Sequence, residues 1–597
     1  MASNRALEIN GEEDDNAALE RAITLSLEQN LTRNGPSSVP AVEPELDDTD
    51  EHNETVHSTK DATRNASSVL GLDRKKMEEE RLARRGKRKA AETASAGDEP
   101  QSQRPKLNSV SPSDRNICEQ SKATRVPQGK QPQESMPVNP RSGEASSPSR
   151  LAFPKGVVKK TWALGYPRKD DIKIEEILQK DDLELAILSS FQWDEDWLMS
   201  KLNLRQTKVI LIAYATDETQ QAEMRSNVPR DIIRFCFPSM EGASYMHSKL
   251  QLLKYPDHLR IAVPTGNLVP YDWGESGVME NMVFLIDLPR IDDPEERLNN
   301  ELPLFGKELS HFLSAQGMDH KLVESLRNYD FSETSRYGFV HTIGGSHVSD
   351  RQHTGYYGLA RAVNALGLAT DKPVDVDYVS ASVGSITREF VASLYKACQG
   401  DLSTTESKKI TANPKNKHVV PSTNLSTILK ERFRVYFPSV ETVTQSRGGK
   451  TGAGTICLQA RWWSSPTFPR EILRDCKNVR PGLLLHSKLI FVRRIPTDAN
   501  QCVGWAYLGS ANLSESAWGR LVKDRATGQP KLNCRNWECG VLVPVSMHSF
   551  DQNAIYGSDG KASMSETFHG CIPVPMETPG SQHDFNGPKR PWFYREA

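Results

Sequence analysis

The residues His247-Ser248-Lys249-Leu250 recur unchanged as His486-Ser487-Lys488-Leu489. Each copy is followed by the same ordered features: a small residue before Asn-Leu, then Trp-Gly, then an acidic residue that opens an apolar segment. These features are Gly266-Asn267-Leu268, Trp273-Gly274 and Glu280-Asn281-Met282-Val283 in the first copy, and Ala511-Asn512-Leu513, Trp518-Gly519 and Glu538-Cys539-Gly540-Val541 in the second. Because the order is kept, and the interval from Asn to Trp is 6 residues in both copies, the sequence predicts a duplicated structural unit.

The residue types in each copy suit the chemistry of a phosphate diester. A His and a Lys two positions apart on a strand point to the same face, and an Asn after a second strand can reach the same place. Two such units facing each other would hold the phosphate oxygens with two Lys and two Asn, while one His attacks phosphorus and the other protonates the leaving oxygen. No paired carboxylates or Cys/His ligand spacing accompany them, so we expect no metal and no cofactor. A lone His-x-Lys is usually structural, and a duplicated pair kept only as scaffold is the alternative.

Apolar runs around the duplication indicate a mixed α/β fold. The segments 208–215, 259–264 and 482–492 have the continuous apolar character of buried strands. Helices are predicted over about 173–190 and 353–366. Together with the repeat, these elements predict two pseudo-symmetric halves, 153–335 and 336–597.

The aromatic residues mark where the folded part begins. The 597-residue chain has 10 Trp, 15 Tyr and 18 Phe, and the earliest of them is Phe153. A segment without rings to bury cannot offset its ordering entropy, so residues 1–152 are predicted to form a disordered arm. Lys and Arg number 4 against 15 Asp and Glu over residues 1–61, and 18 against 11 over residues 62–150. The net charge of -2 thus hides an acidic and a basic segment and does not exclude nucleic acid as a partner.

Two short motifs lie in this arm. Residues 12–29 place an acidic lead before one helical stripe made of Leu19, Ala22, Ile23 and Ser26, which resembles a ubiquitin-interacting motif. The alternative is an amphipathic helix with no special partner. Residues 84–106 hold a dense basic block, which favours nuclear import over a merely solvated tail. We therefore expect nuclear localisation, with ubiquitin as a candidate partner.

Cysteine usage and hydropathy narrow the cellular setting. The nine Cys include no C-x-x-C pair, which favours free thiols in a reducing compartment over disulfides or a zinc site. No apolar run resembles a signal peptide or a membrane span. We expect a soluble intracellular protein that does not engage a membrane, and a monomer, since two half-sites in one chain complete the pocket.

Duplicated His-Lys-Asn half-sites resemble the phospholipase D superfamily, and this variant is similar to the tyrosyl-DNA phosphodiesterase family. Phospholipase D proper has an Asp where Lys254 and Arg493 stand here, whereas Asn267 and Asn512 fill the role found in the tyrosyl-DNA enzymes. The resemblance covers about residues 155–597, including FQWDEDWL at 191–198, the run 382–385 and Pro591-Trp592-Phe593. It implies two α-β-α sandwich halves that form one active site.

The resemblance also implies roles that the pseudo-symmetry leaves open. His247 would be the nucleophile that forms a phosphohistidine with the 3′ end of DNA, and His486 the general acid and then the base. Glu538 matches an acidic residue that hydrogen-bonds a catalytic imidazole, and its partner position, usually Gln in relatives, falls at or near Glu280. The phosphate would be bound by two ammonium and two carboxamide groups, Lys249, Lys488, Asn267 and Asn512.

Contacts with the DNA are implied upstream of the phosphate. Ser382 and its neighbours would contact DNA phosphates, with Ala381 where a second Ser is often found. Phe191 or Trp193 could stack on a base, a mode that tolerates any sequence. Both are more often core aromatics, so a purely structural role is the alternative for them.

The implied function is repair of DNA by hydrolysis of the bond between a topoisomerase I tyrosine and the DNA 3′ phosphate, leaving a 3′-phosphate. Other 3′ adducts would be removed more slowly where the leaving group is poorer. Two alternatives remain at this point. A phospholipase D-type lipid hydrolase would act on liposomes, and a ubiquitin-binding nuclear scaffold with a vestigial hydrolase body would bind ubiquitin without any turnover.

Overall fold

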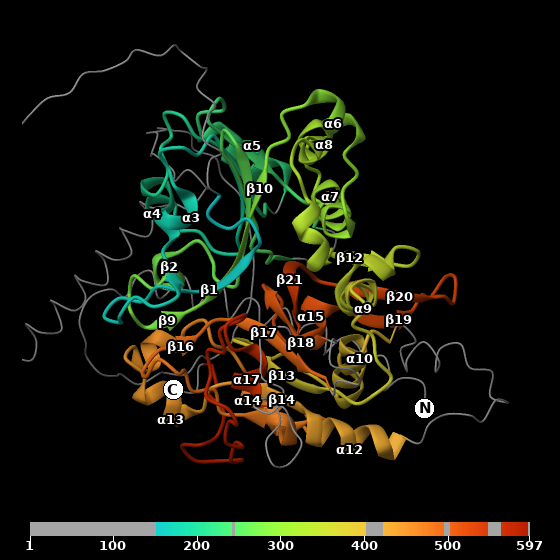
Figure 1. Cartoon of the computed structure of the whole chain (residues 1–597). Helices are drawn as coiled ribbons and strands as arrows, with labels where there is room; N and C mark the ends of the chain where they lie inside the picture. Colours follow the sequence, from blue (N-terminus) through green and yellow to red (C-terminus); the bar gives the residue numbers. More distant parts are fainter. Residues whose placement is uncertain are drawn as a thin grey trace, which may run out of the picture. The chain divides into compact units, whose positions relative to one another are not determined.

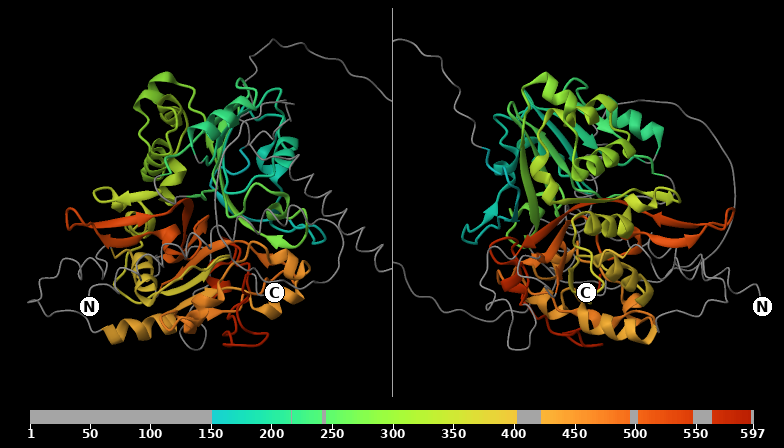
Figure 2. Two further views of the ribbon diagram at one scale, coloured as in Figure 1. Left: turned by 180° about the vertical axis from the view of Figure 1, so that it is seen from behind. Right: turned by 45° about the vertical axis from the view of Figure 1, so that its right-hand side comes forward.

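The computed structural model describes residues 151–594 apart from 216, 241–244, 402–421, 495–501 and 547–562. The motifs predicted at 12–29 and 84–106 lie outside the described residues. The described body is a mixed α/β structure organised around two large sheets, as predicted (Figure 1). The views of Figure 2 show the earlier part of the body, in blue and green, and the later part, in yellow to red, in separate layers.

The first sheet is formed before residue 290 and has the strand order β2-β1-β10-β8-β7-β3-β4-β5. In chain order its strands are β1 (Val157–Thr161), β2 (Asp171–Ile172), β3 (Leu185–Ser189), β4 (Lys208–Ile212), β5 (Ile233–Cys236), β7 (Gln251–Lys254), β8 (His258–Pro264) and β10 (Met282–Pro289). Strands β3, β4 and β5 run parallel, while β7, β8, β10 and β1 continue the sheet with antiparallel pairs.

The second sheet repeats this topology with the strand order β11-β21-β18-β17-β13-β14-β15. Its strands are β11 (Gly338–Thr342), β13 (Asp375–Val379), β14 (Phe433–Tyr436), β15 (Leu473–Arg474), β17 (Lys488–Arg493), β18 (Cys502–Gly509) and β21 (Asn536–Ser546). Parallel β13, β14 and β15 are followed by antiparallel pairs to β17, β18, β21 and β11. Seven strands thus occur twice in one order, which gives the sequence repeat a structural counterpart.

Two short strand pairs join the repeated units to each other. In the first pair, β6 (Tyr245–Met246) runs parallel to the beginning of β21. In the second, β16 (Leu484–Leu485) runs parallel to β9 (Met279–Glu280). Each unit therefore contributes one short strand, β6 or β16, that pairs with a strand of the other unit. In both cases this exchanged strand ends directly before the repeated His-Ser-Lys.

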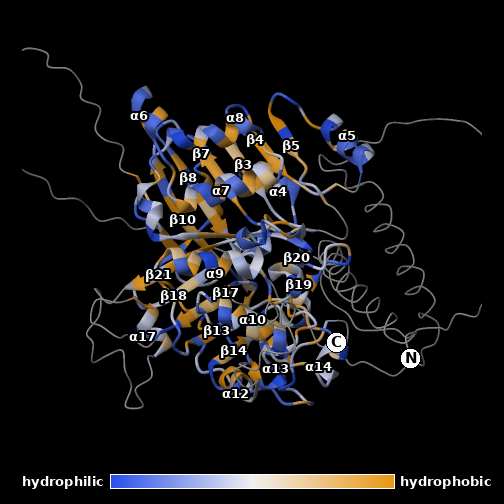
Figure 3. Ribbon diagram, turned by 90° about the vertical axis from the view of Figure 1, so that its right-hand side faces the viewer, coloured by the Kyte–Doolittle hydropathy of each residue, from blue (hydrophilic) through white to orange (hydrophobic). Residues whose placement is uncertain are grey.

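Helices and a hydrophobic core complete the layers. One face of the first sheet packs on α3 (Ile174–Leu178) and α4 (Glu195–Ser200), and one face of the second on α9 (Gly355–Ala365) and α10 (Arg388–Cys398). A third core cluster combines residues from both sheets with α7 (Leu304–Ala315). Figure 3 shows the strands of both sheets mainly in the hydrophobic colour, as expected for buried sheets.

The remaining elements lie around these layers. They are α5 (Glu218–Ser226), α6 (Pro294–Asn299), α8 (His320–Glu324), α12 (Ser422–Arg432), α13 (Val440–Gln445), α14 (Ala460–Ser464), α15 (Glu515–Trp518), α17 (Met564–Phe568), and a small sheet of β12 (Gly345–His347), β20 (Pro530–Cys534) and β19 (Arg520–Lys523). Among the described residues, no helix has the length and apolarity needed to cross a membrane. The described cysteines are all free thiols, as the sequence predicted.

The predicted elements match the structure in part. The strands expected at 208–215 and 259–264 are β4 and β8, and the helix at 353–366 is α9. The helix expected over 173–190 is wrong beyond Leu178, because Gln179 adopts a left-handed conformation with φ of 40° and ends α3. Residues after it form β3, which is buried between β4 and β7. The boundary proposed at 335/336 stays a prediction.

The repeated Trp-Gly pair has a structural cause in both units. Gly274 and Gly519 have positive φ values of 79° and 93°, which L side chains rarely adopt. A Cβ on Gly274 would lie 1.6 Å from the Trp162 carbonyl oxygen, and one on Gly519 would lie 2.7 Å from a Leu532 side-chain atom. Both turns thus require glycine to direct the chain away from the site.

Candidate active site

The repeated His-Ser-Lys segments lie on extended connections rather than inside named strands. His247 and Lys249 lie between β6 and β7, and His486 lies between β16 and β17, of which Lys488 is the first residue. The expectation that both residues of a pair sit within one strand is therefore wrong. The segments are held in place by hydrogen bonds that continue the exchanged strands β6 and β16. The His247 N–H donates to the Trp537 carbonyl at 3.0 Å, and the His486 N–H donates to the Glu280 carbonyl at 3.1 Å.

The first imidazole is held by a carboxylate from the other repeat. Nδ1 of His247 lies 2.9 Å from Oε2 of Glu538. Burial alone would raise the pKa of Glu538, but His247, Lys249 and a hydrogen bond from Ser510 bring it below its usual value. An ionised carboxylate only accepts hydrogen bonds, so Nδ1 carries the proton and Nε2 keeps its lone pair. The predicted contact between Glu538 and a catalytic imidazole is present.

The second imidazole has a partner that the sequence did not indicate. Nδ1 of His486 lies 2.8 Å from Oδ1 of Asp272, in the short helix η1 (Pro270–Trp273). Asp272 also accepts hydrogen bonds from the Asn267 backbone N–H at 2.7 Å and from Asn281 Nδ2 at 3.0 Å. Burial opposes ionisation of Asp272, yet His486 and Lys488 bring its pKa below the usual value. His486 is therefore held in the same tautomer as His247.

The prediction that Glu280 takes this position is corrected by the structure. The Glu280 side chain pairs with Nε of Arg480, and Nη2 of Arg480 donates to the Thr161 carbonyl at 2.7 Å. Burial raises the pKa of Glu280, and Arg480 opposes that rise. Glu280 contributes its backbone carbonyl to His486, while its carboxylate connects the halves away from the imidazoles.

Replacement of Arg480 is expected to destabilise the fold. The Glu280 side chain is 0% exposed and that of Arg480 is 13% exposed, so Arg480→Ala would leave a buried carboxylate unpaired. We expect the free energy of unfolding, measured in urea, to fall by about 3–5 kcal/mol. Arg388→Ala is the control, because its pair with Glu471 is partly exposed and is worth at most about 1 kcal/mol. If adding Glu280→Gln recovers no stability, the buried charge is not the cause.

The two carboxylates come from positions that are not equivalent in the repeat. Ser510 Oγ donates to Glu538 and accepts from the Cys539 N–H; in the first unit Thr265 Oγ1 donates to Asn281 and accepts from the Met282 N–H. Asn281 is therefore the counterpart of Glu538. Counting from the repeated Asn, the counterpart of Asp272 is Ala517. Each half supplies one acid to the other half, but from a different element.

Both lysines are buried next to the imidazoles. Lys249 Nζ donates to the His247 carbonyl at 2.8 Å, and Lys488 Nζ to the His486 carbonyl at 2.5 Å and to the Thr265 carbonyl at 3.3 Å. Burial and then the charge of Lys249 bring the pKa of Lys488 well below its usual value. Both lysines also act electrostatically on both imidazoles. The two half-sites therefore form one site, in which a bound anion would relieve repulsion between cations.

The carboxamide side chains of the repeated Asn267 and Asn512 each form a hydrogen bond with a residue that borders the site. Asn267 Nδ2 donates to Gln192 Oε1 at 3.3 Å, and Gln192 Oε1 also accepts from Tyr271 at 2.7 Å. Asn512 Oδ1 accepts from the Ser382 N–H at 3.1 Å. With its oxygen occupied, the Asn512 amide presents N–H groups to an anion, as a phosphate-binding role requires. Gln192 was not singled out from the sequence; its place in FQWDEDWL, beside Phe191, is the one available signal.

The remaining predicted residues border this site. Ser382 is buried, and its backbone forms an isolated β-bridge with Cys457. Its contact to Asn512 is made by the backbone N–H and not by the hydroxyl. The ring of Phe191 lies 5.0 Å from that of His247 at an angle of 52°. Trp193 packs against the core beside α3 and α4. The structure thus places Phe191 beside His247 and Trp193 against the core, and the DNA contacts expected of these residues stay predictions.

Burial sets the protonation state of both imidazoles. It lowers the pKa of His247 to about 4, and the charge of Glu538 opposes that shift. It likewise lowers the pKa of His486 to about 4, against the charge of Asp272. At neutral pH both rings are uncharged in the free protein, so each keeps one nitrogen lone pair. A bound anion favours the charged form of a neighbouring ring, so anion binding would favour protonation of either imidazole.

Neutralising each carboxylate is expected to give different pH profiles. Asp272 raises the pKa of His486, and an acid must be protonated, so Asp272→Asn should move the alkaline limb of the kcat profile to lower pH. Glu538→Gln lowers the pKa of His247. Because His247 is already neutral, the alkaline limb of the kcat profile should not move in this variant. Its expected effect is a loss of about 10²- to 10⁴-fold in adduct formation, because the tautomer is no longer fixed. Identical profiles for both variants would contradict these roles.

A body with two topologically identical sheets and paired His-Lys-Asn half-sites defines a phospholipase D-like protein. The family model for tyrosyl-DNA phosphodiesterase matches residues 157–584. Tyrosyl-DNA phosphodiesterase 1 of Drosophila melanogaster is 25% identical over 391 residues, covering 62% of this chain and 62% of that protein. The Arabidopsis thaliana protein of the same name is 23% identical over 388 residues, covering 62% and 58%. The chain belongs to the tyrosyl-DNA phosphodiesterase family.

A solved structure supports the same fold. The crystal structure of the yeast tyrosyl-DNA phosphodiesterase is 16% identical with a TM-score of 0.50, covering 72% of this chain and 97% of that chain. The chain spans about three fifths of the length of the Drosophila and Arabidopsis relatives.

Proposed function

We propose that this chain hydrolyses the phosphodiester bond between a tyrosine and the 3′ end of DNA through a covalent phosphohistidine. One observation carries the proposal: two buried imidazoles each bind an ionised carboxylate of the other half through Nδ1. Both Nε2 atoms are thereby left for the substrate. Two buried lysines beside them supply the positive charge that a phosphate diester needs. Membership of the family supports the tyrosyl-DNA bond as the bond that is broken.

The first step transfers the DNA phosphate to His247. Its Nε2 lone pair attacks phosphorus, and the bond between phosphorus and the tyrosine oxygen breaks. The electron pair of that bond goes to the phenolic oxygen, which takes the Nε2 proton that His486 acquires from solvent when the diester anion binds beside it. The phosphorylated ring of His247 is then cationic, and its Nδ1–H donates to Glu538, which stabilises the charge. Lys249 and Lys488 neutralise the phosphate oxygens.

The second step releases the DNA. His486, now neutral, takes a proton from water, whose oxygen attacks phosphorus on the side that tyrosine has left. The phosphorus–nitrogen bond breaks, and its electron pair returns to Nε2 of His247. The products are a DNA 3′-phosphate and the tyrosyl peptide, and both imidazoles regain their starting protonation. His486 donates a proton in the first step and accepts one from water in the second.

We further propose a topoisomerase I remnant as the peptide. Tyrosine has a side-chain pKa of about 10, so phenolate leaves far more readily than an alkoxide. Other 3′ adducts are then substrates in the order of their leaving groups. The arm, outside the described residues, is proposed to direct the chain to the nucleus and to bind ubiquitin, as its two motifs predict.

The test uses an oligonucleotide with a 3′-phosphotyrosine, incubated with the full chain in excess EDTA. Formation of the 3′-phosphate product is expected, because no step uses a metal. Its absence would reject the proposal. Phosphatidylcholine vesicles form the comparison arm: release of choline there, without DNA product, would favour a lipid hydrolase. Ubiquitin binding without turnover of either substrate would favour a scaffold.

A further inference from the structure

A second group of chemically active side chains lies outside the phosphodiester site. Glu308 and His311 are three residues apart on α7, so they share one helix face. His341 on β11 joins them from the other half. One donor atom from each of these three residues lies within 4.8 Å of the others. A pair of the form Glu-x-x-His on a helix is an arrangement that helical metal sites use.

The donor atoms in this group have the character of metal ligands. Oε2 of Glu308 lies 3.2 Å from Nε2 of His341, close to the separation of two ligands on a tetrahedral zinc, about 3.3 Å for bonds of about 2.05 Å. His341 is 1% exposed and its Nε2 faces Glu308. Among the described residues, the buried Nδ1 atom of His311 has no hydrogen-bond partner, and such an unpaired buried atom suggests an ion or water bound there.

The two oxygens of the Glu308 carboxylate have different surroundings. Arg361 Nη1 lies 2.7 Å from Oε1, so it fixes the carboxylate with Oε2 directed at the imidazoles of His341 and His353. Such outer contacts orient ligating carboxylates in metal sites.

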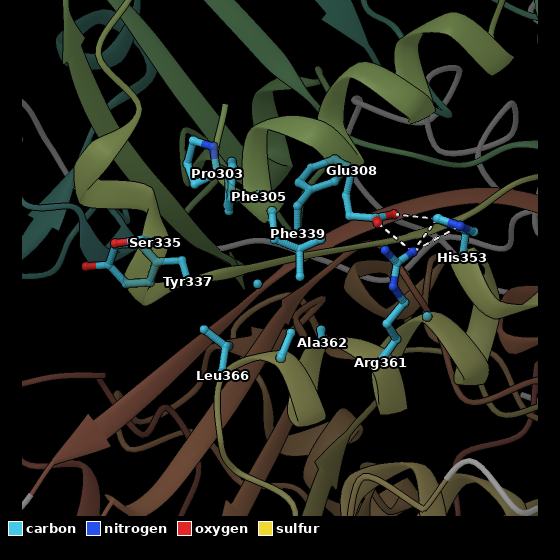
Figure 4. Close-up of a pocket in the computed structure, with 14 residues that line it drawn as sticks. Pro303, Phe305, Glu308, Ser335, Tyr337, Phe339, His353, Arg361, Ala362 and Leu366 are labelled. Atoms are coloured by element: carbon cyan, nitrogen blue, oxygen red, sulfur yellow. Dashed lines mark hydrogen bonds and ion pairs between the residues drawn. The ribbon is translucent and has the colours of Figure 1, made fainter. Parts of the chain in front are cut away.

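A cavity lies beside Glu308, one of the three residues. It has a volume of about 240 Å³ and is lined by α7, β11 and α9. Figure 4 shows Glu308, His353 and Arg361 together at one end of this cavity, with apolar side chains such as Phe339 and Leu366 along the rest. His353 Nδ1 lies 3.2 Å from Oε2 of Glu308 and also contacts Nη1 of Arg361, so this carboxylate oxygen faces imidazoles from β11 and from the turn before α9.

We propose that Glu308, His311 and His341 form a binding site for a divalent transition-metal ion, most suitably Zn²⁺. Two imidazole nitrogens and one carboxylate oxygen are ligands that zinc prefers, with the fourth position open to water or His353. The ion would connect α7 of the first half to β11 of the second. The ion would take no part in the phosphodiester chemistry, which uses no metal. We therefore expect ion binding to affect the stability of the fold.

The test measures Zn²⁺ binding to the full chain after treatment with chelator. A chromophoric chelator competes for Zn²⁺, and wild type is compared with His311→Ala and His341→Gln. We expect the zinc affinity to fall at least about tenfold in each variant, since even outer-shell changes cost about 10- to 100-fold. His320→Ala, on α8 with a side chain 82% exposed, is the matched control and should bind as wild type does.

Two further readouts separate a metal site from a hydrogen-bonded cluster. Zn²⁺ should raise the Tm of wild type and of His320→Ala but not that of His311→Ala, because binding to the native state alone stabilises it. Co²⁺ should give d–d absorption in wild type that is lost in His311→Ala. Equal zinc affinity in wild type and His311→Ala, or no binding to wild type, would overturn the proposal. DNA-adduct hydrolysis in EDTA is scored separately, so failure of one proposal is distinguishable from failure of the other.

Discussion

Replacing His247 with Ala is expected to abolish hydrolysis of a 3′-phosphotyrosyl oligonucleotide. The ring is the group that forms a bond to phosphorus, and its Nε2 is made available by the contact between Nδ1 and Glu538. Loss of a nucleophile that acts as part of a unit typically costs about 10⁶-fold in kcat. Single-turnover assays followed on a denaturing gel would measure both product and any protein–DNA adduct, and neither is expected.

The control for this variant is His320→Ala, which removes an exposed imidazole on α8. It should retain wild-type turnover. Thermal unfolding of His247→Ala would show whether the fold persists, since the ring is buried. A folded His247→Ala protein that still forms a covalent adduct with the DNA would assign the nucleophile to another residue.

Replacing His486 with Ala is expected to slow turnover by about 10²- to 10⁴-fold, the usual contribution of a general acid or base. The rates of phosphohistidine formation and of its hydrolysis should fall by different factors. Phenolate can leave without full protonation, whereas water is a poor nucleophile without a base. The phosphohistidine on His247 is therefore expected to accumulate, visible as a protein–DNA adduct that is stable through denaturation.

The double variant of His247 and His486 tests the assignment of roles. It should show neither adduct nor product. An adduct that survives in the double variant would place the covalent bond elsewhere. If His486→Ala instead lost adduct and product together, then His486 would be essential to the first step and not mainly to the second.

The duplicated site could be predicted from the sequence because its residues repeat in order. The resemblance predicted that Glu538 binds one of the two imidazoles, and the structure shows that this is His247, whereas the partner of His486 was not predicted. Reading the two acidic segments as equivalent placed Glu280 there, one residue before Asn281, the true counterpart of Glu538. The acid that replaces it, Asp272, stands where the other unit has Ala517, so the repeat carries no signal for it.

Other features depend on contacts between distant parts of the chain. The segment 185–189 has the apolar character of both a buried helix and a strand, and β4 and β7 decide that it is β3. The link between Gln192 and Asn267 joins two loops with no shared pattern. The metal-ligand group unites α7 with β11, and no local spacing relates His311 to His341.

The exchange of β6 and β16 between the repeats has a consequence for how such a site could originate. Two identical units exchanging these strands as separate chains would present the same acid to both imidazoles, and neither ring could specialise. Once the units share one polypeptide, each can change alone. Here one unit carries its acid at Asp272 and the other at Glu538. Joining the two units in one polypeptide thus allows the proposed roles of nucleophile and acid to be divided between two rings that the repeat supplies in equal form.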